Sequence, residues 1–211
     1  MRVLVACEYS GIVRDAFAKK GHDAWSCDIL PTESEGNHIQ GDVLEILDQK
    51  WDLMIAHPPC THLTVTGARW FTEGRKDYQL QRDGIAFVQK LMDAPIDKIA
   101  IENPVSVISS YIRPADQLIN PFQYGDAIAK RTCLWLKNLP KLMPTHNLEA
   151  EYVTHKSGKR MSKWYYETSS LPRKNGERAK ARSKFFQGIA DAMAEQWGHD
   201  EFQLVQQIQI D

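Results

Sequence analysis

The hydrophobic positions of this chain form short runs that alternate with longer segments of helical periodicity. Five short runs rich in aliphatic residues predict buried strands; they span residues 2–6, 23–27, 51–57, 98–102 and 132–136. Three segments with apolar residues at helical spacing predict helices; they span residues 11–20, 77–92 and 185–197. This alternation predicts an α/β fold, a mostly parallel sheet flanked by helices that binds ligands at the carboxyl ends of its strands.

The length of 211 residues predicts one main domain with a small appended module. Residues 1–140 contain the five predicted strands and form the main domain. Residues 141–183 are rich in basic side chains, are interrupted by Pro144 and Pro172, and are predicted to form a small basic substrate-recognition module or loop. Residues 184–211 are predicted to return to the main domain as a closing helix and tail.

The composition is that of an ordinary globular protein. Hydrophobic residues make up 43% of the chain, which excludes a disordered, collagen-like or coiled-coil protein. No apolar run approaches the ~20 residues that cross a membrane, and the N-terminal residues lack the features of a signal peptide. The cysteines are widely separated and predict neither a disulfide framework nor a zinc ribbon. We therefore expect a cytoplasmic protein that does not contact a membrane; its oligomeric state stays open.

The net charge of −1 conceals a strong asymmetry along the chain. Residues 152–184 contain ten Lys and Arg against two Glu, so this stretch carries +8 and the remainder −9. The aromatic residues 164–166 lie among these basic residues, a mixture typical of surfaces that bind phosphates and stack bases. We predict that Lys159, Arg160 and Lys163 bind the phosphates of DNA or of a nucleotide. A solvated charged loop is the alternative.

One predicted strand runs directly into two prolines and a cysteine, Pro58, Pro59 and Cys60. The prolines fix the backbone and present one thiol, which becomes a nucleophile if nearby positive charge populates its thiolate. A buried structural cysteine is the alternative. A metal site formed by His57, Cys60 and His62 would place three ligands within six residues, which leaves little room for tetrahedral geometry. We therefore expect no metal.

The next predicted strand ends in Glu102 and Asn103, before a proline. If the two strands are parallel neighbours, Cys60 and Glu102 emerge at the same edge of the sheet. A thiol beside a carboxylate is the pair needed to add a nucleophile to a pyrimidine ring while protonating or holding a ring nitrogen. The alternative for Glu102 is a cap of a helix or turn.

Two acidic residues and one glycine are candidates for binding a cofactor. Asp28 follows the second predicted strand, about 20 residues after the first turn, where a carboxylate can bind both hydroxyls of a ribose. Asp42, within Gly41-Asp42-Val43, and Gly11 in the first turn are weaker signals. A turn-capping role suits either Asp equally well.

Together these motifs resemble the DNA cytosine carbon-5 methyltransferase family. That family has a Pro-Cys nucleophile after one strand and a Glu-Asn pair after the next, similar to Pro59-Cys60 and Glu102-Asn103 here. Gly41-Asp42-Val43 looks like its cofactor-base loop, and Lys130-Arg131 is similar to its basic motif that contacts the cytosine and a neighbouring phosphate. The likeness covers residues 2–139 in order.

The resemblance implies a Rossmann-like, S-adenosylmethionine-dependent methyltransferase fold in which residues 1–140 are the catalytic domain. It implies that Cys60 attacks carbon 6 of cytosine, that Glu102 engages ring nitrogen 3 and the exocyclic amine, and that Lys130 or Arg131 steadies the base. Asn103 would join the substrate-binding residues. The implied cofactor-binding residues are Ser10, Gly11, Asp28, Asp42 and Pro58.

Three functions stay open from the sequence. The first is methylation of cytosine at carbon 5 in DNA. The second is the same chemistry on a free deoxycytidine nucleotide, which a small recognition module would permit. The third is a non-catalytic nucleic-acid-binding or interaction protein with this fold, which the first turn favours because Cys7 to Gly11 keep only one glycine of the family's glycine-rich loop.

Overall fold

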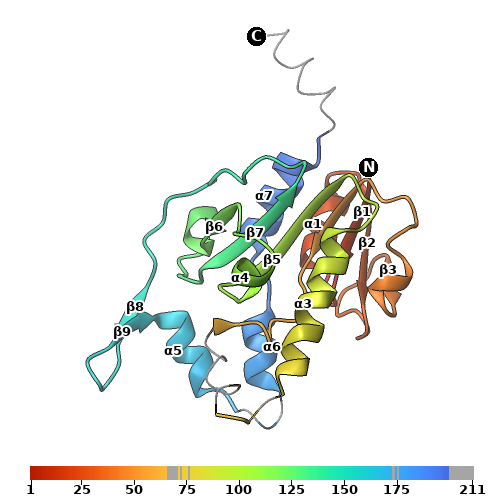
Figure 1. Ribbon diagram of the computed structural model, residues 1–211. Helices are drawn as coiled ribbons and strands as arrows, with labels where there is room; N and C mark the ends of the chain where they lie inside the picture. The colour runs from red at the N-terminus through yellow and green to blue at the C-terminus, as the bar shows by residue number, and fades with distance from the viewer. Residues whose placement is uncertain (66–70, 72, 76, 173, 175, 200–211) are drawn as a thin grey trace.

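The computed structural model describes residues 1–65, 71, 73–75, 77–172, 174 and 176–199. The predicted tail beyond residue 199 lies outside this described part. Within it, the main sheet has seven strands in the order β3-β2-β1-β4-β5-β7-β6 (Figure 1). The strands are β1 (Arg2–Ala6), β2 (Asp23–Asp28), β3 (His38–Gln40), β4 (Leu53–Ala56), β5 (Lys98–Pro104), β6 (Gln117–Ile119) and β7 (Thr132–Lys137).

The first five strands of the sheet are parallel, and β7 runs antiparallel to both of its neighbours. The strand order reverses at β1, from which the chain adds β2 and β3 on one side and β4 and β5 on the other. Such a reversal opens a crevice at the carboxyl ends of the central strands. The predicted α/β, Rossmann-like fold with a mostly parallel sheet is therefore confirmed.

Helices cover both faces of the sheet (Figure 1). One face packs against α1 (Ile12–Lys19) and α7 (Gln187–Trp197), and these two helices also contact each other. The other face packs against α3 (Tyr78–Met92) and the short α4 (Ile108–Tyr111). Alternate residues of each strand enter the two cores; in β1, Val3 and Val5 face α1 whereas Leu4 and Ala6 face the opposite core. This double burial explains why the strands appear in the sequence as continuous apolar runs.

The long predicted elements match the structure to within about two residues. The predicted strand 51–57 is shorter, since β4 ends at Ala56 and Pro58 has no N–H to extend the ladder. Short elements escaped prediction, among them β3, β6, α4 and the 3₁₀ turns Val43–Glu45 and Pro121–Tyr124. The short strands β3 and β6 depend on pairing with the neighbouring strands β2 and β7.

The basic segment forms a hairpin and two helices: β8 (Tyr152–Thr154), β9 (Arg160–Ser162), α5 (Lys163–Ser170) and α6 (Glu177–Ser183). Figure 1 shows the hairpin projecting away from the main sheet. In the same view α6 lies beneath the carboxyl ends of the central strands of the main sheet. The division into a catalytic region and a recognition module stays a prediction. No described helix is long and apolar enough to cross a membrane.

Candidate active site at the carboxyl ends of the strands

A cavity of about 650 Å³ lies where β1, β4 and β5 end. The turn after β1 forms one wall, the ends of β4 and β5 form the floor, and α6 with the residues after it forms the opposite wall. Its lining includes Ser10, Glu102 and Lys130 from the predicted site. It also includes residues that the sequence did not single out, among them Glu8, Tyr9, Lys180 and Phe185.

His57 and Glu102 form the buried centre of this site. The Nδ1 of His57 donates a hydrogen bond to Oε2 of Glu102 at 3.3 Å, and the two side chains are 13% and 11% exposed. The sheet register explains the pairing, because Ile55 lies beside Ala100 and the next residues on the same face of each strand are His57 and Glu102. The sequence analysis considered His57 only as a metal ligand. The register of the two strands is the signal that would have predicted its pairing with Glu102.

Glu102 is a carboxylate at neutral pH. Burial alone would raise its pKa, but the hydrogen bond and charge of His57, followed by the charge of Lys130 and a hydrogen bond from Thr132, outweigh burial and lower the pKa below its ordinary value. A group whose pKa is lowered on folding stabilises the fold above its unfolded pKa and loses this contribution as the pH falls through its folded pKa. The pair of His57 and Glu102 therefore stabilises the folded protein at neutral pH, and this contribution is lost in acid.

Of the two neighbouring basic residues that the sequence proposed, Lys130 reaches the site. Its ammonium lies 5.5 Å and 5.2 Å from the ring centroids of Trp164 and Phe186, and it donates to the backbone carbonyl of Arg182 at 3.2 Å. Arg131, the other predicted candidate, is exposed and does not line the cavity; its charge acts instead on Cys133. Neighbouring residues of an extended chain point to opposite sides, so only one of the two can face Glu102.

Asn103 joins the two sequence motifs that carry the predicted chemistry. Its side chain is buried, and its Nδ2 donates to the backbone carbonyl of Pro58 at 2.8 Å. Pro58 is itself buried beneath this contact. Asn103 therefore fixes the loop after β4 against β5, whereas direct contacts of Asn103 with substrate and of Pro58 with cofactor stay predictions.

Cys60 is partly exposed and lies within electrostatic reach of Glu102 and Lys130. Burial and the charge of Glu102 raise its pKa, which Lys130 and the residue's own backbone N–H lower only in part. The positive charge of Lys130 therefore does not populate the thiolate in the resting site. The thiol of Cys60 is protonated, and any nucleophilic role needs a group that takes up its proton.

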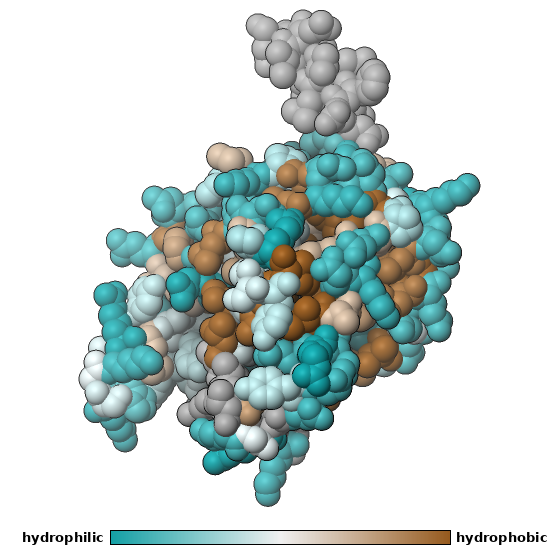
Figure 2. All heavy atoms as spheres, in the orientation of Figure 1, coloured by the Kyte–Doolittle hydropathy of each residue, from teal (hydrophilic) through white to brown (hydrophobic). Residues whose placement is uncertain are grey.

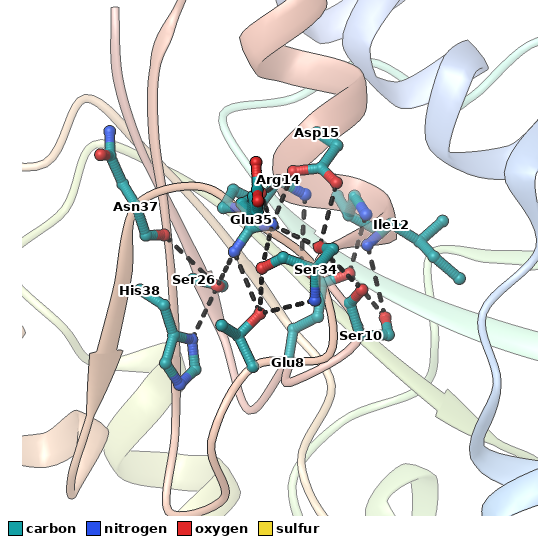
Figure 3. A network of polar contacts seen from close by, with 12 residues as sticks. Glu8, Ser10, Ile12, Arg14, Asp15, Ser26, Ser34, Glu35, Asn37 and His38 are labelled. Atoms are coloured by element: carbon teal, nitrogen blue, oxygen red, sulfur yellow. Dashed lines mark hydrogen bonds and ion pairs between the residues drawn. The ribbon is translucent and has the colours of Figure 1, made fainter.

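The first turn is organised by Glu8 rather than by glycine (Figure 3). The buried carboxylate of Glu8 accepts the backbone N–H of Val13 at 2.7 Å and of Arg14 at 3.2 Å, and so caps α1. Arg14 is buried as well, and its guanidinium binds Ser34 and the carbonyl of Glu35. Figure 3 shows these groups converging from the turn, the helix and the loop after β2.

Gly11 is enclosed by that network. It has a left-handed backbone with φ of 75°, which favours glycine, and a Cβ there would collide with Ser34 and Arg14. Gly11 is not among the described residues that line the cavity, whereas its neighbour Ser10 is. The structure thus explains the glycine by close packing against the loop after β2, and its predicted contact with a cofactor stays untested.

Asp28 and Asp42 lie at one corner of the site, outside the lining of the cavity. Both carboxylates act on the thiol of Cys7. Burial is the largest cause that raises the pKa of this thiol, to about 12, and the charges of Asp28, Cys27 and Asp42 add to it. Each Asp caps a local turn with Oδ1: Asp28 accepts the N–H of Leu30 at 2.9 Å, and Asp42 accepts the N–H of Leu44 at 3.0 Å. The turn-capping alternative is therefore present in the structure, and the second oxygen of each has no partner within the described residues.

The three predicted phosphate-binding residues lie on the projecting hairpin and at the start of α5, away from the cavity. Lys159 is exposed, Arg160 stacks at 4.5 Å over the ring of Tyr152, and Lys163 donates to Glu151 at 2.7 Å. Figure 2 shows mostly hydrophilic side chains over this projection.

The segment α6 connects the basic region to the cavity. Lys180 forms an ion pair with Glu33, and Ser183 lies 3.4 Å from the hydroxyl of Tyr9. These contacts span more than half of the chain, so local sequence patterns could not reveal them. The charge segregation was the only sequence signal that pointed here.

The described residues contain no group of three His, Cys, Asp or Glu side chains placed to hold a metal ion. His57, which the metal alternative required, is committed to Glu102.

No protein-family profile and no curated protein sequence matches the chain. Among solved structures, it is similar to an Escherichia coli protein described as a candidate DNA modification methyltransferase encoded within a prophage. The two share 14% identity with a TM-score of 0.46 over 85% of this chain and 68% of the other.

Proposed function

We propose that this protein is an S-adenosylmethionine-dependent methyltransferase that methylates cytosine at carbon 5 in DNA through a covalent adduct with Cys60. The observation that carries the proposal is that Cys60, just after β4, lies within electrostatic reach of Glu102 on the adjacent parallel strand β5 and of Lys130 from the segment before β7. The order and spacing of the Pro-Cys and Glu-Asn motifs support it independently, because they resemble the cytosine carbon-5 methyltransferases.

The residues of the chain divide the chemistry between them. Cys60 Sγ forms a bond to carbon 6, and the electrons of the ring double bonds shift toward nitrogen 3, which gains a proton. Glu102 engages that nitrogen and the exocyclic amine, and Lys130 steadies the base. Asn103 keeps the Cys60 loop in place through its bond to Pro58. The adduct makes carbon 5 electron-rich, and loss of its proton after methylation releases Cys60.

The resting site suits a cofactor without phosphates. The pyrophosphate of a dinucleotide binds at the N-terminus of the first helix in many α/β folds. Here the carboxylate of Glu8 already occupies the N-terminus of α1 and would repel a phosphate. S-adenosylmethionine has no phosphate, and when bound it supplies an electrophilic methyl group.

Asp28 and the residues after it fit the nucleoside part of that cofactor. The free oxygen of Asp28 can accept the hydroxyls of a ribose. Ile29 and Leu30 are 76% and 48% exposed, an apolar surface that suits the face of an adenine ring. We therefore assign the ribose to Asp28 and the adenine to the adjoining apolar surface.

Asp28→Ala is expected to weaken binding of S-adenosylmethionine by about 1–3 kcal/mol, the usual cost of losing a charged hydrogen bond. Isothermal titration calorimetry measures the effect. Asp48→Ala removes an exposed carboxylate of the same charge outside the site and is the matched control. Unchanged affinity in Asp28→Ala would remove Asp28 from the site, and a wild-type protein with no affinity would favour the non-catalytic alternative.

Replacing Lys159, Arg160 and Lys163 together by alanine is expected to weaken DNA binding and to flatten the slope of log K against log salt by about 2–3, since each lost phosphate contact removes about 0.9. Fluorescence anisotropy over a salt series measures the slope. The lower value applies if Lys163 keeps its pairing with Glu151 in the complex.

The matched control replaces Lys19, Lys20 and Lys90, which removes the same charge from other helices and likewise includes one ion-paired lysine, Lys20 with Glu195. If the variant of Lys159, Arg160 and Lys163 keeps the wild-type slope, the alternative of a solvated charged loop is the correct one. If wild type lacks affinity for DNA yet methylates deoxycytidine monophosphate, the free nucleotide is the substrate.

A further inference from the structure

His57 is held on two sides, and one of its ring nitrogens has no partner. Because a carboxylate only accepts, Nδ1 must carry the proton in the bond to Glu102. The ring of Phe185 packs against the imidazole at 4.6 Å between centroids with a tilt of 56°. Nε2 is buried without a hydrogen-bond partner within the described residues. Among the described residues, the bond to Glu102 is therefore the one hydrogen bond that the imidazole makes.

The proposed reaction requires one proton to change place within this site. The Sγ–H bond of Cys60 breaks, the Sγ–C6 bond forms, and ring nitrogen 3 gains a proton. The resting site contains a protonated thiol and an ionised carboxylate, so the proton that leaves Cys60 has an acceptor in Glu102. A buried carboxylate without a donor would itself be protonated and could not accept it.

We propose that His57 is a positioning residue that acts through Glu102: by donating from Nδ1 to Oε2 it keeps the carboxylate ionised, so that Glu102 can take the proton of Cys60 and deliver it to the ring nitrogen. The final delivery rests on the proposed function, whereas the control of Glu102 by His57 does not. His57 thereby decides whether Glu102 begins the cycle as a base.

Other charged groups surround the pair but do not replace His57. Lys130 faces Glu102 from the segment before β7 and also lowers its pKa, after His57 in size. Across the cavity, Glu8 is bound by the N-terminus of α1, and Glu33 is paired with Lys180. The remaining charged groups of the cavity wall are Glu177 and Lys184.

The test compares two substitutions that separate hydrogen bonding from imidazole chemistry. His57→Ala removes the donor, whereas His57→Asn keeps an N–H donor at a similar reach from the backbone. The pKa of Glu102 is read by carbon-13 NMR of labelled glutamate carboxyls, with Glu102→Gln to assign the signal. His57→Ala should raise this pKa by about 1–3 pH units, and His57→Asn, which restores the hydrogen bond but not the charge, should recover the part due to the hydrogen bond. Thr132→Val removes a smaller contribution to the same carboxylate and should give a smaller rise.

The kinetic readout is exchange of tritium from carbon 5 of cytosine in DNA, which reports adduct formation. His57→Ala should move the acid limb of the pH dependence of exchange upward by the same shift as the Glu102 pKa, so that exchange slows below neutral pH, and His57→Asn should move it part of the way back. An unchanged Glu102 pKa in His57→Ala, or a His57→Asn variant that keeps the donor bond but exchanges as slowly as His57→Ala, would overturn the assignment. If wild type neither exchanges tritium nor transfers a methyl group, the proposed function fails, and the NMR titration still decides whether His57 controls Glu102.

Discussion

Cys60→Ser is expected to abolish methyl transfer, with a loss beyond the roughly 10⁴-fold that removal of an acid-base group produces. A serine hydroxyl is a much weaker nucleophile than a thiolate, and the site around Cys60 already disfavours an anion. Single-turnover transfer from labelled S-adenosylmethionine to cytosine-containing DNA measures the loss. Binding of the cofactor should be nearly unchanged, because the substitution alters a single atom.

Cys7 provides the matched comparison for that experiment. Cys7 lines the cavity, which Cys60 does not, and its pKa of about 12 keeps the Cys7 thiol protonated and inert. Alkylation by iodoacetamide should therefore label Cys60 before Cys7, and labelling of Cys60 should accelerate as the pH rises toward its raised pKa. Cys60→Ser with wild-type transfer rates would contradict covalent catalysis by this residue.

Glu102→Gln is expected to slow turnover by about 10²–10⁴ and to leave cofactor affinity nearly intact. Glutamine keeps the size of the side chain and can hold a ring nitrogen or His57, but it cannot accept a proton from Cys60 or deliver one to the ring. Single-turnover rates separate this loss from any change in DNA binding. If Glu102→Gln slows the single-turnover rate by less than tenfold, Glu102 does not transfer a proton in the reaction.

The same variant gives an independent reading of the buried pair. Because the folded pKa of Glu102 is lowered, wild type should lose stability as the pH falls through the acidic range, from about 4.3, the unfolded pKa, downward. Glu102→Gln cannot lose this contribution, so its thermal midpoint should depend less on pH over that range. Melting followed by circular dichroism in buffers of different pH provides the comparison.

The sequence was sufficient for the framework of the fold, because buried parallel strands and amphipathic helices leave strong local patterns. The runs at β1, β4 and β5 were predicted close to their observed bounds. Their order along the chain also predicted that Cys60 and Glu102 would emerge at one edge. The local pattern could not predict short strands such as β3 and β6. These segments are strands because they pair with β2 and β7, which the local sequence does not show.

The site shows the same division. The choice between Lys130 and Arg131 required knowing which side of the extended chain faces Glu102. Gly11 suggested a cofactor loop, but the loop after β2 packs on it through Ser34, which local sequence does not reveal. The protonation of Cys60 depends on burial and on Glu102, a residue from another strand. His57 was within reach of prediction, because strand register alone places it beside Glu102.

The most direct test of the account is to trap the adduct on Cys60. DNA carrying 5-fluorocytosine has no proton to lose from carbon 5 after methylation, so the enzyme should remain attached to the base. With S-adenosylmethionine present, mass spectrometry of a digest should show methylated fluorocytosine on the peptide that contains Pro58-Pro59-Cys60, and the adduct should be absent from Cys60→Ser. An enzyme that methylates ordinary DNA but forms no such adduct would contradict the account and point to methylation of an exocyclic amine without covalent catalysis.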